Sequence, residues 1–164
     1  MSVHPEGKKM FCEVQYFPWW ATIPMAASAP FVLILGLTQA GTKPVPLPLA
    51  LLMSLFLAGI FLLMFRMVTT VYEDRIVVKF GWLPLVRFTI PLSEIQSARA
   101  VTYKPLLEFG GWGIRFGRAR KLAYSTQGNK AVEVVTTKRT ILIGTALPDQ
   151  LNEVVNNLLV FYRS

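Results

Sequence analysis

The longest uncharged stretch of the chain, residues 45–65, constrains the fold more than any other feature. Its 21 residues (VPLPLALLMSLFLAGIFLLMF) include no charged side chain, and Arg66 follows directly. A helix of that length rises about 31 Å, which matches the roughly 30 Å hydrocarbon core of a bilayer. The sequence therefore predicts a membrane-spanning helix here.

A second uncharged stretch, residues 17–37, comes before it and is also long enough to span. Trp19 and Trp20 stand at its start, where an interfacial aromatic belt is expected, and two prolines inside it are typical of kinked membrane helices. The alternative is a signal peptide cleaved near Ala29. We disfavour it because the apolar residues continue past Ala29 and the second span follows almost at once.

Residues 39–44 contain Gly and Pro and predict a tight turn, so residues 16–65 form a transmembrane hairpin. Residues 1–15 are predicted to be a polar cytoplasmic tail. Small residues on both spans would let the helices approach closely. Basic residues flank the hairpin on the side of both chain ends, and only Lys43 lies in the turn. The positive-inside rule then places both termini in the cytoplasm.

No ionisable side chain lies within either predicted span, which argues against a transporter that works alone. The net charge is +8, and residues 66–164 carry 14 Lys or Arg against 7 Asp or Glu. Such a charge suits anionic membrane lipids and would also suit RNA, but a solvated basic surface explains it equally well. We expect membrane lipids as partners, and no nucleic acid.

The chain has one cysteine, Cys12, and one histidine, His4. No disulfide can form within the chain, and a Cys/His zinc site cannot be built within it. Acylation of Cys12 is conceivable because it lies near the expected membrane boundary. The sequence predicts no metal and no cofactor.

From Arg66 onwards, the pattern changes to short β-rich runs separated by turns. The predicted strands cover residues 67–72, 75–80, 86–90, 97–103, 121–125, 131–135 and 140–143. Residues 104–118 are predicted to be a glycine-rich loop. From Leu147 onwards, apolar residues recur at helical spacing and predict one amphipathic helix. The class is therefore α+β, with a curved antiparallel sheet covered by a C-terminal helix.

The run Gly110-Gly-Trp-Gly-Ile-Arg115, with Tyr124, Gly128, residues 131–134 and 141–145 and the final helix, resembles the bacterial pleckstrin-homology-like (PH-like) domain. The likeness extends to small membrane proteins in which two spanning helices precede such a domain. It implies a bent antiparallel β-barrel capped by the C-terminal helix, in residues 66–164. It also implies the bacterial inner membrane and a protein-binding, assembly or lipid-facing role, without enzyme activity.

Four basic residues fall within seven positions and are candidate contacts for anionic lipid or an acidic partner. They are Arg115, Arg118, Arg120 and Lys121. A second candidate feature is a loop anchored by Trp112 among Gly110, Gly111 and Gly113. Its glycine spacing fits neither the P-loop nor the dinucleotide-binding pattern.

No nucleophile–base pair or paired acid–base groups stand out in the sequence, so we predict no enzyme activity. The leading hypothesis is a non-catalytic adaptor or assembly module that binds a protein, which can itself be a membrane protein. One alternative is a sensor of anionic lipid. Another is an accessory subunit of a larger transporter or channel, and self-association stays open.

Overall fold

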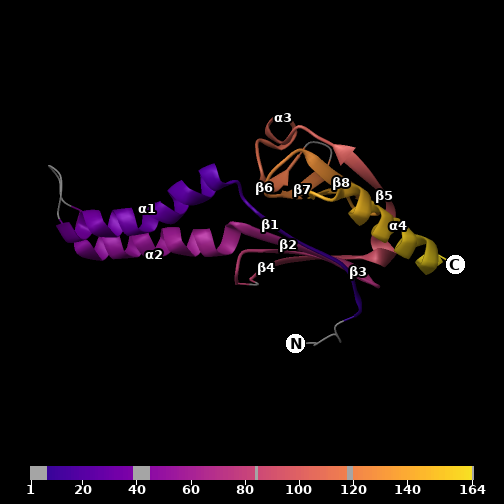
Figure 1. Cartoon of the computed structure of the whole chain (residues 1–164), viewed down its shortest axis with the longest axis horizontal. Coiled ribbons are helices and arrows are strands. Elements are labelled where there is room, and N and C mark those ends of the chain that lie inside the picture. The colour runs from indigo at the N-terminus through magenta and orange to yellow at the C-terminus, as the bar shows by residue number, and fades with distance from the viewer. Residues whose placement is uncertain (1–6, 39–44, 84, 118–119, 164) are drawn as a thin grey trace.

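The structure is a computed structural model that describes residues 7–38, 45–83, 85–117 and 120–163 (Figure 1). A two-helix hairpin projects from one end of a β-rich body. The elements in chain order are β1 (Lys9–Tyr16), α1 (Trp19–Thr38), α2 (Leu47–Met64), β2 (Arg66–Tyr72), β3 (Arg75–Phe80), β4 (Val86–Pro91), η1 (Leu92–Glu94), β5 (Ile95–Thr102), α3 (Pro105–Phe109), β6 (Gly113–Phe116), β7 (Lys121–Ser125), β8 (Lys130–Thr136), β9 (Thr140–Gly144) and α4 (Pro148–Arg163).

The hairpin agrees with the two predicted spans, because α1 and α2 are both long and apolar enough to cross a membrane. They pack against each other through small residues: a Cβ at Gly36 would overlap the Cβ of Ala50. The Ser54 hydroxyl donates a hydrogen bond of 2.9 Å to the carbonyl oxygen of Ala29 on the facing helix. Most other side chains of the hairpin face outward. The predicted turn at 39–44 lies outside the described residues.

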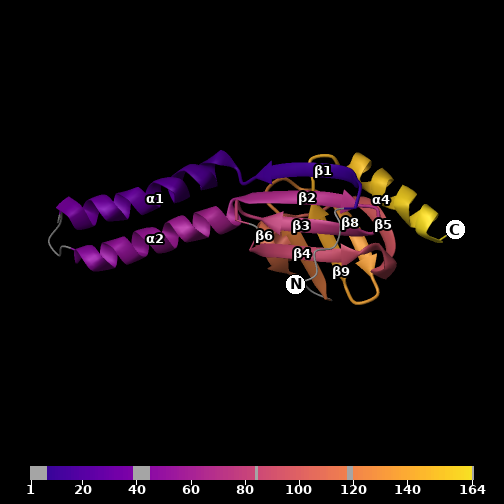
Figure 2. The same ribbon diagram turned by 90° about the horizontal axis from the view of Figure 1, so that it is seen from below.

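The prediction of a polar tail for residues 1–15 differs from the structure, because Lys9–Tyr16 forms β1. This strand pairs antiparallel with β2, from Lys9 opposite Tyr72 to Tyr16 opposite Arg66. Glu13 and Gln15 are the buried residues of β1, and the half-buried Phe11 is its apolar contact with the core, so the strand's sequence resembles a solvated segment. Each helix of the hairpin therefore continues into a strand of the same sheet (Figure 2).

The predicted bent antiparallel β-barrel is not observed, because the described strands form two separate sheets that do not close into a barrel. One sheet has the order β1-β2-β3-β4 and the other β5-β8-β9-β7-β6. Strands β7 and β9 pair in parallel, with Lys121 opposite Thr140. Two elements, α3 and β6, occupy the segment predicted to be a loop.

The main core lies between the two sheets and includes Val78, Phe80, Tyr124 and Val134. The amphipathic helix predicted at the C-terminus is confirmed as α4, which buries Leu151, Val155 and Leu159. It packs against β5 and β8 and covers one open side of the core (Figure 1). A second cluster, which includes Phe109 of α3, lies on the outer face of the second sheet.

The first sheet packs closely against the end of the hairpin. Gly81, with a φ of 79°, follows β3, and a Cβ there would overlap the carbonyl oxygens of Leu62 and Leu63 at the end of α2. The next amide, that of Trp82, donates a hydrogen bond of 2.8 Å to the carbonyl oxygen of Leu62. The first sheet is thus fastened to the hairpin at several points.

Candidate binding groove

The two sheets are open to solvent along the side opposite α4. Among the described residues, β4 pairs only with β3, and β6 pairs only with β7. Each sheet therefore ends there in an unpaired edge strand. An edge of this kind carries backbone N–H and C=O groups that another strand can use.

A groove of about 570 Å³ lies along this open side, between β4 and the β6-β7-β9 part of the second sheet. Both sheets supply its apolar residues, which include Phe88, Ile90, Ile114, Phe116, Tyr124 and Ile141. The rings of Phe88 and Tyr124 stack with centroids 4.7 Å apart and join the two sides. Burial raises the pKa of Tyr124 to about 12, although the positive charge of Arg139 opposes this shift.

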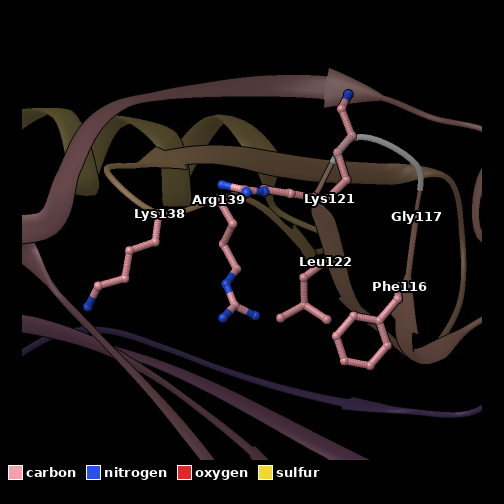
Figure 3. A pocket seen from close by; sticks show the side chains of 7 residues that line it. Phe116, Gly117, Lys121, Leu122, Lys138 and Arg139 are labelled. Atoms are coloured by element: carbon pink, nitrogen blue, oxygen red, sulfur yellow. The ribbon is translucent and has the colours of Figure 1, made fainter.

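A smaller basic cleft of about 370 Å³ shares residues with this groove. Figure 3 shows Lys138 and Arg139 extending to the same side as Phe116 and Leu122. Lys138 pairs with Glu94 at 2.9 Å. In the described part of the chain, the Arg139 guanidinium has no carboxylate partner within 4.0 Å.

The predicted basic residues that the structure describes do not form a single cluster. Arg120 lines the basic cleft, whereas the Arg115 side chain bonds back to the carbonyl oxygen of Trp112 at 3.0 Å. Lys121 borders the cleft, but its ammonium points away from Phe116 and Leu122 (Figure 3). Arg118 lies outside the described residues.

Lys121 and Arg99 instead share one carboxylate, that of Glu133 on β8. Lys121 Nζ lies 3.3 Å from Glu133 Oε1, and Arg99 Nε donates to Oε2 at 2.6 Å. Burial by itself would raise the pKa of Glu133, but hydrogen bonds and charge from Arg99 and Lys121 outweigh it, so the pKa is lowered. This triad is satisfied within the fold, so among the described residues that line the cleft Arg120 and Arg139 are the cations without an ion pair.

The glycine-rich loop lies at the end of the domain nearest the hairpin. Gly110 ends α3 with a φ of 71°, and Gly111 and Gly113 also have positive φ. The Trp112 indole N–H donates to the carbonyl oxygen of Gly128 at 2.9 Å. Its ring meets that of Trp20 edge-on, with centroids 6.2 Å apart, so this loop contacts the first turn of α1.

Lys138 and Arg139 lie between the strands predicted at 131–135 and 140–143, and the sequence did not assign them to a site. The alternation of Phe88 with Ile90, and of Ile114 with Phe116, was the available signal for two inward faces. It does not show which strands remain unpaired, because pairing depends on the whole topology.

No family model and no curated protein matches this chain. Within the described residues, no group of three or more His, Cys, Asp or Glu side chains is placed to hold a metal ion. The features available for a functional argument are therefore the hairpin, the groove and its basic end.

Proposed function

We propose that this protein is a membrane-anchored, non-catalytic module that binds a protein partner in the groove between β4 and β6. The observation that supports the proposal is the groove itself, which joins an apolar floor to a basic end beside two unpaired strand edges. Concave apolar surfaces with a few polar groups are typical binding sites. The resemblance to PH-like domains agrees with such a role.

In this proposal, the hairpin spans a bacterial inner membrane and both chain ends lie in the cytoplasm. Strand β1 leads into the hairpin and strand β2 leaves it at the same end. All four tryptophans of the chain gather near that end: Trp19 and Trp20 begin α1, Trp112 contacts Trp20, and Trp82 stacks on Phe61 of α2. Trp19 and Trp20 are 74% and 54% exposed, as expected for a belt at the membrane surface.

The geometry gives less support to a sensor of anionic lipid in the same membrane. Trp112 and Gly113 mark the end of the second sheet that faces the hairpin. The strand register places Lys121 opposite Thr140, at the other end of that sheet. Lys138 and Arg139 precede Thr140, so the basic cleft faces away from the proposed membrane surface. A partner in the cytoplasm would reach it more directly than a lipid headgroup.

Site-specific photocrosslinking in cells tests the function. A benzophenone side chain replaces Phe116, which is 78% exposed at the groove, and a second variant carries it in place of Tyr162, which is 56% exposed on α4. We expect one protein to crosslink from position 116 and to be absent from position 162. Equal products from both positions, or lipid alone at position 116, would contradict a groove-specific protein partner. A polytopic partner would identify the chain as an accessory subunit.

Placement in the membrane is tested separately by tryptophan fluorescence. Full-length protein in vesicles with lipids brominated at different depths should lose most emission with bromine near the headgroups, because the tryptophans gather at one level. Equal quenching by bromine at the bilayer centre would contradict the proposed position. Reporters fused to the C-terminus should be active only if they are of a type that works in the cytoplasm. Activity of a periplasmic reporter would mean that the orientation is the opposite of the proposed one.

A further inference from the structure

The groove specifies the chemistry of its partner more narrowly than a general protein surface would. We infer that it takes an extended, acidic segment of another protein, which adds as a strand to the free edge of β4 and places carboxylates beside Arg120 and Arg139. This inference rests on the proposed function and names the kind of partner. Three independent properties of the groove support it.

The first property is the free edge. Strand β4 is paired with β3 over its whole length, from Val86 opposite Phe80 to Pro91 opposite Arg75, and has no other strand beside it in the described structure. An extended peptide can therefore form main-chain hydrogen bonds along β4, as in other cases of strand addition. Pro91 has no N–H to donate and limits the pairing at that end.

The second property is the apolar floor. Phe88 and Ile90 are two residues apart on β4 and both line the groove, where Tyr124 and Ile141 of the second sheet face them. A strand beside β4 would direct every second side chain into this space. The floor thus favours a segment with apolar residues at alternate positions and excludes one that is charged throughout.

The third property is the unequal charge around the groove. Arg120, Lys138 and Arg139 stand at one end, and Glu94 is the only acidic residue among the described residues that line either cavity. Lys138 already pairs with that carboxylate. Arg120 and Arg139 are left without ion pairs in the described structure and are matched best by carboxylates of a partner.

Binding of defined peptides tests the inference. The probes are three fluorescent peptides of one length: one alternates Val and Glu, one alternates Val and Lys, and one is the Val/Glu peptide with Pro at alternate positions. Full-length protein in nanodiscs of neutral phosphatidylcholine keeps lipid charge out of the measurement. By fluorescence anisotropy, we expect the Val/Glu peptide to bind and each of the others to bind at least about tenfold more weakly.

Charge reversal locates the binding. The variant Arg120→Glu/Arg139→Glu should weaken the Val/Glu peptide by about tenfold or more, whereas Lys104→Glu/Lys130→Glu should change it by less than about threefold. Both variants change the net charge equally, and neither Lys104 nor Lys130 lines the groove. Equal losses in the two variants would mean general electrostatic attraction and would overturn the inference. Undiminished binding of the proline peptide would overturn strand addition.

A different set of results would separate this inference from the proposed function. If no peptide binds below about 1 mM, or if the protein crosslinked from Phe116 contributes a helical or basic segment, the acidic strand is wrong and a groove-binding partner remains. If the crosslink itself is absent, the proposed function fails. The crosslinking experiment makes no assumption about the partner's charge or conformation, so the two failures are distinguishable.

Discussion

Replacing Glu13 by alanine should destabilise the domain strongly, although Glu13 lies in a segment that reads as a polar tail. Its side chain is on β1 of the first sheet, and the residue is only 8% exposed. The carboxylate accepts a hydrogen bond of 2.5 Å from the Thr145 hydroxyl and one of 2.8 Å from the Ala146 amide. Both donors follow β9 of the second sheet. Glu13 therefore joins the two sheets near the side covered by α4.

The size of the effect follows from these two bonds. A hydrogen bond to a charged group contributes about 1.5–3 kcal/mol, so the pair sets an upper range of about 3–6 kcal/mol. Ala146 is exposed, so its amide regains water when the carboxylate is removed. We therefore expect Glu13→Ala to lower the free energy of unfolding by about 3 kcal/mol. Glu13→Gln keeps an acceptor but loses the charge, and should cost about half as much.

Thermal unfolding of the full-length protein in mild detergent measures this effect. A change of 1 kcal/mol moves the Tm of a domain of this size by about 4–8 °C, so Glu13→Ala should lower it by about 10 °C or more. Glu73→Ala is the matched control, because Glu73 is exposed between β2 and β3. Equal Tm values for the two alanine variants, with Glu13→Gln unchanged, would refute the role of β1 in joining the sheets.

Three further predictions concern other parts of the molecule. Gly36→Ala should destabilise the hairpin by about 1–3 kcal/mol in an SDS unfolding titration, because its Cβ would overlap Ala50. Gly59→Ala meets nothing within 4 Å and should be neutral or slightly stabilising; equal effects at both glycines would contradict the observed packing. The lowered pKa of Glu133 means that its ionised form stabilises the fold above its usual pKa near 4.5, and this contribution is lost as the pH falls through the folded value. The Tm difference between wild type and Glu133→Gln should therefore be constant from about pH 6 to 8 and shrink below about 4.5; an unchanged difference at low pH would contradict the ion pairs. Tyr124 should ionise near pH 12 in an absorbance titration, and Tyr124→Phe should remove that step. The neutral form of Tyr124 stabilises the fold below its usual pKa of 10.0, and this contribution to stability is lost as the pH rises through about 12. Ionisation near pH 10 would show that the Tyr124 hydroxyl is exposed to solvent.

The sequence predicted those elements that depend on local pattern. The two apolar helices follow from long uncharged runs, and α4 follows from the spacing of Leu151, Val155 and Leu159. The β1 strand was missed because its two buried residues, Glu13 and Gln15, are polar and bond to the other sheet. Pattern methods identify an inward face by its apolar residues, so they miss a strand whose buried residues are polar.

The pairing of the strands could not be predicted from local pattern in the same way. Short β-rich runs at 121–125 and 140–143 predicted two strands, but their parallel pairing depends on β8 crossing to lie beside both β5 and β9. The groove has the same origin, because it exists only where β4 and β6 both remain unpaired. The candidate residues taken from one run of sequence, Arg115 to Lys121, were consequently divided between different surroundings. Arg139, which is 18 positions beyond Lys121, lies at the same cleft.

The two sheets are connected to the hairpin in different ways. Two strands of the first sheet are continuous with the hairpin, because β1 leads into α1 and α2 leads into β2. In addition, Gly81 at the turn after β3 lies against the end of α2. The second sheet is joined to the first through η1, through α4 and through the bonds that Glu13 and Gln15 make. The connections through α4, Glu13 and Gln15 lie away from the free edges of β4 and β6, whereas η1 follows β4 directly and places Glu94 at the groove. A strand added along β4 would therefore leave the connections made by α4, Glu13 and Gln15 intact, while the stacked rings of Phe88 and Tyr124 hold the two sides of the groove together.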